Sequence, residues 1–156
     1  MASVVAAAIA ALVAVLVYFL GQRQSTVERK RRASAEAIAD ALSWLELPYR
    51  IRRRTSDTPE TLGALAERVH HLQERLLFHE NWLRIEIPQA YPKYQELVWG
   101  VKEVALPFMR EAWNTAPIDD ASSMNVGDLG IRLDSELVEG FSDEVKKQLA
   151  LWRIWS

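Results

Sequence analysis

All three histidines of this chain lie within one short stretch, ERVHHLQERLLFHENWL, which runs from Glu67 to Leu83. Histidine and glutamate at helical spacing occur in zinc-peptidase helices, where two histidines bind the metal and the glutamate is the base, and in di-iron bundles, where both bind metal. A zinc-peptidase helix needs a second histidine four positions after His79, where this chain has Leu83. A di-iron bundle needs Glu-x-x-His on two helices, and Glu67 with His70 is the only such pair in the sequence. The stretch therefore predicts neither kind of metal site.

The histidine stretch is part of a heptad pattern of apolar residues, which predicts a helix with one buried face. The seam of this pattern consists of Leu62, Leu65, Val69, Leu72, Leu76, His79 and Leu83. His70 and His71 fall on the water-facing side of the pattern, whereas His79 falls in the seam. We therefore expect His79 to face the core or a partner helix, and not to bind a metal ion.

The remaining sequence contains no recognisable catalytic or ligand-binding motif. Gly127 and Gly130 lack the lysine and helix start of a phosphate-binding loop, and no Gly-x-Ser-x-Gly elbow occurs. The acidic residues between Asp119 and Glu139 do not have the spacing of a calcium loop, and no pair of acids can be named as catalysts. The chain has no cysteine, which excludes a thiol nucleophile. These features predict a protein that is not an enzyme and has no metal, cofactor or small-molecule substrate.

The N-terminal segment is apolar and carries no charge from Ser3 to Gln22. As a helix it would span roughly 30 Å, which matches the hydrocarbon core of a bilayer. A cleaved signal peptide would begin with positive charge, which is absent here, and a buried core helix would need a large partner surface. The sequence thus predicts a transmembrane anchor over residues 1–22.

Positive charge follows the apolar segment directly. Residues 22–54 contain nine Lys or Arg and four Asp or Glu, although the whole chain has a net charge of −2. The membrane-proximal basic residues are Arg23, Arg29, Lys30, Arg31 and Arg32. This placement predicts an external N-terminus and a cytoplasmic C-terminal domain. A second basic run, Arg50–Arg54, favours lipid headgroups over nucleic acid, because the rest of the domain is acidic.

Small residues recur every four positions in the apolar segment, at Ala6, Ala10 and Ala14. This spacing allows transmembrane helices to pack closely, although alanine is also neutral filler. It supports an alternative function, a self-assembling membrane protein such as a small pore, lysis factor or oligomeric membrane factor. The segment has no polar stripe to line a channel, which counts against a pore.

Helix signals divide the rest of the chain into four segments. A first helix is expected over 25–47, ended by Pro48, and a basic connector over 49–57. Thr58 and Pro59 begin a second helix that ends near Pro88, and a third follows over 92–114. A long linker over 114–140 precedes a fourth helix that starts at Ser142.

The predicted fold is all-α, with one transmembrane helix (1–22), a basic juxtamembrane part (23–57) and a helical cytoplasmic domain (58–156). Together the helices form a small antiparallel bundle of about four helices.

Six tryptophans are distributed over the predicted helices. Large aromatic side chains either pack in a core or anchor a contact with a partner or a bilayer surface. The partner-binding candidates are His79, Trp82, Trp113, Trp152 and Trp155. Together with the anchor and the absence of a catalytic set, they predict a membrane-anchored interaction or scaffold module. Its expected partners are the lipid bilayer and another protein or a second copy of the chain.

Overall fold

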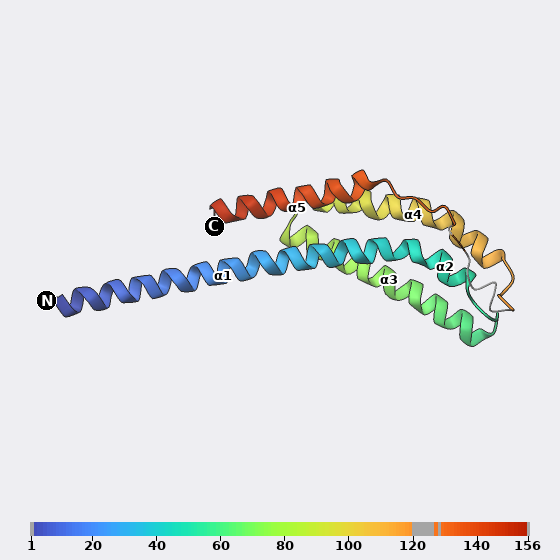
Figure 1. Ribbon diagram of the computed structural model, residues 1–156, viewed down its shortest axis with the longest axis horizontal. Helices are drawn as coiled ribbons and strands as arrows, with labels where there is room; N and C mark the ends of the chain where they lie inside the picture. Colours follow the sequence, from blue (N-terminus) through green and yellow to red (C-terminus); the bar gives the residue numbers. More distant parts are fainter. Residues whose placement is uncertain (1, 120–126, 128, 156) are drawn as a thin grey trace.

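The computed structural model describes the backbone of residues 2–119, 127 and 129–155, and the side chains of residues 12–119, 127 and 129–152. Over these residues the fold is all-α, without a strand. Its elements are α1 (Ala2–Ser43), the 3₁₀ turn η1 (Trp44–Glu46), α2 (Leu47–Arg52), α3 (Pro59–Glu86), α4 (Tyr91–Asn114) and α5 (Ser135–Trp155). The long helices α1, α3, α4 and α5 run in alternating directions and form a bundle (Figure 1).

Helix α1 extends far beyond the bundle at its N-terminal end (Figure 1). Its 42 residues join the expected apolar helix and the first helix of the domain into one continuous element. The residues at the junction, from Gln22 to Arg32, are mostly good helix formers and carry no proline. Where α1 meets the bundle, buried residues recur every three or four positions, at Lys30, Ser34, Ala37 and Ala41.

Pro48 does not end helical structure, as the sequence led us to expect. It lies in the first turn of α2, which continues to Arg52 and so includes residues 49–52 of the expected basic connector. A proline is tolerated at this position because the first backbone N–H groups of a helix have no intrahelical acceptor. The buried side chains of Leu47, Pro48 and Ile51 pack α2 into the core.

The start of α3 is confirmed at Thr58 and Pro59. The Thr58 hydroxyl accepts a hydrogen bond from the Thr61 backbone N–H at 3.4 Å, which caps the helix. Helix α4 begins at Tyr91, one residue before the predicted start, and contains Pro107 in its interior.

Helix α5 begins at Ser135, seven residues before the predicted start at Ser142. The Asp134 carboxylate accepts a hydrogen bond from the Glu136 N–H at 2.9 Å and so caps the helix. Ser142 is therefore internal to the helix, and its hydroxyl donates to the Val138 carbonyl at 2.7 Å. The turn-forming and acidic residues of 114–140 predict a linker over that whole range, but those from Ser135 onward form the first turns of α5.

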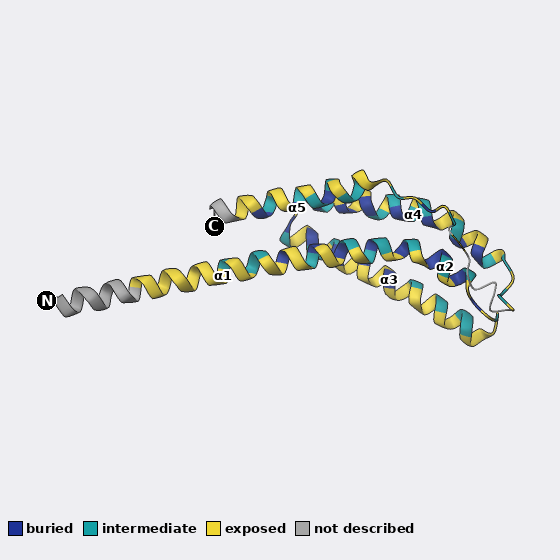
Figure 2. Ribbon diagram, in the orientation of Figure 1, coloured by how far each residue is buried: buried dark blue, intermediate teal, exposed yellow. Residues whose placement is uncertain are grey.

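The core lies between the four long helices and is closed at one end by η1 and α2 (Figure 2). Leu83, Leu97 and Phe141 from three different helices are fully buried within it. Gly100 allows α4 and α5 to approach closely, because a Cβ atom there would collide with the side chain of Leu137. These contacts set the position of α5 beside α4.

Candidate interaction surfaces

The apolar segment Leu12–Leu20 of α1, here called the projecting segment, lies outside the bundle. Every one of its side chains is exposed (Figure 2). Consecutive positions point in all directions around a helix, so the apolar surface surrounds it. A helix that is apolar on every side normally lies within lipid or protein. Ala14 is exposed in this segment, whereas the side chains of Ala6 and Ala10 lie outside the described residues.

Over the described residues, no helix contains a stretch that is both long enough and apolar enough to cross a membrane.

The five basic residues after the projecting segment differ in their surroundings. Arg29, Arg31 and Arg32 are exposed, in agreement with a charged surface. Lys30 is only 2% exposed and lies where α1, α3 and α5 meet. Its ammonium group donates to the Glu86 carbonyl at 2.8 Å, pairs with the Glu86 carboxylate at 3.2 Å and lies 3.8 Å from the Trp152 ring centroid. Lys30 therefore connects α1 to α3 and α5, and its side chain is not available at the surface.

Arg23 connects α1 to the end of α5. Its guanidinium donates to the Trp152 carbonyl at 2.8 Å, although the two residues are far apart in sequence. A positive charge at the C-terminal end of a helix interacts favourably with the helix dipole. Arg23 and Lys30 together place the last described turn of α5 beside the start of the basic stretch.

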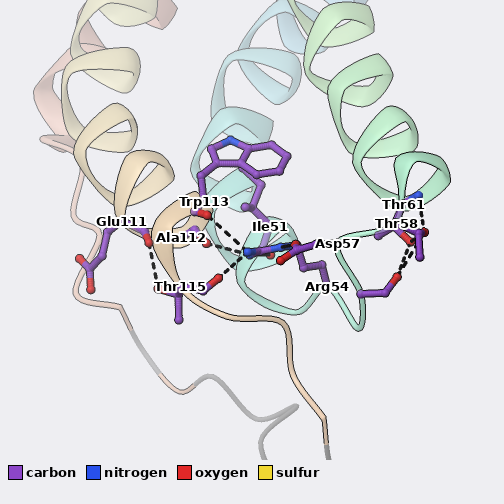
Figure 3. A network of polar contacts seen from close by, with 10 residues as sticks. Ile51, Arg54, Asp57, Thr58, Thr61, Glu111, Ala112, Trp113 and Thr115 are labelled. Atoms are coloured by element: carbon purple, nitrogen blue, oxygen red, sulfur yellow. Dashed lines mark hydrogen bonds and ion pairs between the residues drawn. The ribbon is translucent and has the colours of Figure 1, made fainter.

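The second basic run, Arg50–Arg54, lies at the end of the bundle away from the projecting segment (Figure 1). Helix α1 runs straight from one end to the other, which carries the run away from the expected membrane-proximal position. Arg50 and Arg53 are exposed, but Arg54 is buried. Arg54 binds backbone carbonyls of α4 and is therefore a structural residue (Figure 3).

His79 lies inside the bundle and not on a partner-facing surface. It is 2% exposed, and its Nε2 atom lies 2.7 Å from the Asp40 carboxylate of α1. The same carboxylate oxygen accepts a hydrogen bond from the Arg75 side chain at 2.7 Å. The His79 position in the heptad seam thus corresponds to a contact between α3 and α1.

His70 and His71 are exposed on α3, as the heptad pattern predicts. The His70 Nε2 atom lies 3.3 Å from the Glu74 carboxylate, and the His71 Nδ1 atom lies 3.9 Å from it. In the part of the chain that the structure describes, no group of three or more potential ligands lies close enough to hold a metal ion.

Tyr94 lies in the core next to Phe141, with ring centroids 5.5 Å apart. Burial raises the pKa of its phenol well above the ordinary range, and the negative charges of Asp40 and Glu80 act in the same direction. The phenol therefore stays neutral in the folded protein and acts as a core side chain.

The tryptophans divide between core and surface. Trp44 is buried, and Trp82 and Trp113 are half-buried against the core. Trp152 is 42% exposed at the end of α5, and the side chain of Trp155 lies outside the described residues. The most exposed tryptophan whose side chain is described is Trp99, at 72%, which the sequence did not single out. The spacing of the sequence did contain a signal. Trp99 lies two positions before Val101, which is buried, and residues two apart on a helix point to different sides.

Two apolar surfaces on the bundle were also missed. Leu77, Phe78 and Ile85, here called the α3 outer strip, are exposed on the side of α3 opposite its buried seam. Trp99 on α4 borders an open groove of about 670 Å³ between α4 and Leu137 of α5. Exposed large apolar side chains that cluster on a folded domain commonly mark contact surfaces.

No protein family, curated protein sequence or solved structure matches the chain.

Proposed function

We propose that the chain is a single-pass membrane protein whose helical bundle acts as a protein-interaction or scaffold module at the cytoplasmic face. The anchor comprises residues 1–22. The observation that carries this proposal is the projecting segment, whose side chains are all exposed in the isolated fold. Leaving so much apolar surface in water is unfavourable, whereas lipid would cover it on every side.

The proposed orientation has the N-terminus outside and the bundle in the cytoplasm. Arg29, Arg31 and Arg32 are exposed on the bundle side of the projecting segment, and positive charge of this kind is retained in the cytoplasm. Residues 3–20 carry no charge that would oppose this orientation.

Full-length protein expressed in bacteria is expected to remain in the membrane pellet after alkaline carbonate extraction. The apolar residues of the anchor favour insertion by about 3–6 kcal/mol in total, and each lysine near its centre would cost about 2.5–3.5 kcal/mol. The double variant Leu12→Lys and Val13→Lys should therefore appear in the soluble fraction. Leu77→Lys with Phe78→Lys, which adds the same charge to the α3 outer strip, should stay in the pellet.

Wild-type protein in the soluble fraction would contradict the anchor. The orientation is tested in the same cells with single cysteines, because the chain has none of its own. An impermeant maleimide should label Ser3→Cys but not Ser135→Cys in intact cells. The opposite labelling pattern would overturn the proposed orientation.

The interaction role rests on the α3 outer strip and on Trp99. Both present large apolar side chains to solvent on the bundle. Aromatic residues are enriched at the centres of protein interfaces, and Phe78 and Trp99 are 63% and 72% exposed. The groove beside Trp99 would admit an apolar side chain of a partner.

A photo-crosslinking amino acid at position 78 or 99 is expected to give discrete adducts in membranes of the native host. The same amino acid at Gln73, which is exposed on α3, serves as the control and should give none. An adduct of about twice the 17.8 kDa chain would identify a second copy, and a different mass would identify another protein. Equal crosslinking at all three positions would contradict a defined interface.

A further inference from the structure

A groove separates α1 from the last turns of α5, directly beside the end of the projecting segment. It has a volume of about 660 Å³ and is lined by both helices. A second hollow of about 450 Å³ adjoins it and shares Leu20 and Arg23 with it. Leu16 and Phe19 of the projecting segment line this second hollow, so the two hollows lead from charged to apolar surface.

The charged lining of the groove is mainly positive. Arg23 and Arg31 come from α1, Lys146 comes from α5, and Glu28 is the one carboxylate among the lining residues. Arg31 and Lys146 are exposed. The Arg31 guanidinium lies 4.0 Å from the Glu28 carboxylate, and the Lys146 ammonium group lies 2.8 Å from the Asp143 carboxylate. Such exposed pairs are weak and exchange readily with another anion.

The floor of the groove is apolar, with Val27 of α1 and Leu149 of α5. Leu151 and Trp152, the last residues of α5 whose side chains are described, are also exposed at this end of the bundle. Tryptophan is enriched at the boundary between lipid and water, where its ring and its polar N–H can both be accommodated. Positive groups, an apolar floor and an interfacial aromatic therefore lie within one small region.

We propose that the groove between α1 and α5 binds an anionic phospholipid. The phosphate contacts Arg31 and Lys146, and an acyl chain follows Leu20 and Leu16 along the projecting segment. Arginine suits this role because its planar guanidinium can donate two hydrogen bonds to one phosphate. The inference rests on the proposed membrane anchor, since it places the groove at the level of the lipid headgroups.

The geometry favours a lipid over other anionic ligands. A nucleic acid or an acidic peptide would use the cations but would leave the adjoining hollow of Leu16, Phe19 and Leu20 uncovered. A zwitterionic lipid would cover the apolar surface but would gain less from the positive lining. An anionic phospholipid satisfies both parts.

The test measures binding of phosphatidylglycerol and phosphatidylcholine with identical acyl chains to the full-length protein in nonionic detergent, by native mass spectrometry. Phosphatidylglycerol is expected to bind about tenfold more tightly. The double variant Arg31→Gln and Lys146→Gln should reduce this preference to near unity. Arg32→Gln with Lys147→Gln removes the same two charges at adjacent positions outside the groove and should retain it.

Equal binding of the two lipids by the wild-type protein would overturn the lipid site, even if carbonate extraction had confirmed the anchor. Equal loss of preference in both double variants would also overturn it, because net charge alone would then explain the effect. Inorganic phosphate that displaces phosphatidylglycerol at millimolar concentration would show a free-anion site instead. Wild-type protein in the soluble fraction after carbonate extraction would contradict both the proposed anchor and the proposed lipid site.

Discussion

Replacing Arg54 by methionine is expected to lower the free energy of unfolding by about 3 kcal/mol, because buried hydrogen bonds to a charged group are lost. The Arg54 guanidinium donates to the Ala112 carbonyl at 2.8 Å, to the Trp113 carbonyl at 3.3 Å and to the Thr115 carbonyl (Figure 3). These groups belong to the C-terminal end of α4, where helix carbonyls have no intrahelical donor. Methionine preserves the apolar part of the side chain but cannot donate.

Arg54 also connects the segment between α2 and α3 to α4. It pairs with Asp57 at 2.6 Å and donates to the Ile51 carbonyl at 3.1 Å. Its backbone carbonyl accepts a hydrogen bond from the Ile118 N–H at 2.8 Å. One side chain therefore joins α2, the connection that precedes α3 and the end of α4, and its loss should loosen all three.

Thermal unfolding of the full-length protein in nonionic detergent, followed by circular dichroism, measures the effect. A loss of about 3 kcal/mol corresponds to a decrease of about 10 °C in Tm for a chain of this size. Arg50→Met, in the same basic run but exposed, is the control and should change Tm by little. Equal Tm values for the two variants would show that the Arg54 contacts do not stabilise the bundle.

Phe141→Ala is expected to lower the free energy of unfolding by about 3–5 kcal/mol, because it leaves a cavity in the core. Phe141 is fully buried, and its ring contacts Tyr94 of α4. It lies in the first half of α5, so its removal should release the helix that forms one wall of the α1–α5 groove. Val145 and Leu149 would then be the remaining fully packed side chains of α5, with Leu137 and Val138 only partly buried against the core.

Phe78→Ala is the matched control, because it removes the same side chain from the 63% exposed position on α3. It should change stability by less than about 0.5 kcal/mol. Urea unfolding monitored by circular dichroism distinguishes the two variants. If both variants lost the same stability, the placement of α5 against α4 would be incorrect.

The helices were largely predictable because their signals are local. The Thr58 and Pro59 cap marks the start of α3, and the heptad seam correctly placed Leu72, Leu76, His79 and Leu83 in the interior. The exceptions are places where a local signal has two meanings. Pro48 can end a helix or begin one, and Gly140 occurs in linkers but is accepted within α5 once Phe141 and its neighbours are buried.

The candidate surfaces were less predictable, because residue type does not say which side chains a neighbouring helix will cover. Lys30 and Arg54 belong to basic runs that suggest a charged surface, yet both are buried against helices far away in sequence. Trp99, by contrast, is a large aromatic residue that the fold leaves exposed. The sequence places Lys30 and Trp99 on helices and Arg54 in a connector, but it does not tell which of the three side chains is buried.

By itself, then, the sequence determined the all-α class, the uncharged N-terminal segment and the heptad face of α3. These follow from composition and from spacing along a single helix, so they require no knowledge of neighbours. Only the tertiary structure decided that His79 meets Asp40 and that Arg23 and Lys30 contact the end of α5. Those contacts join residues from opposite parts of the chain, and their geometry exists only after the helices have packed together.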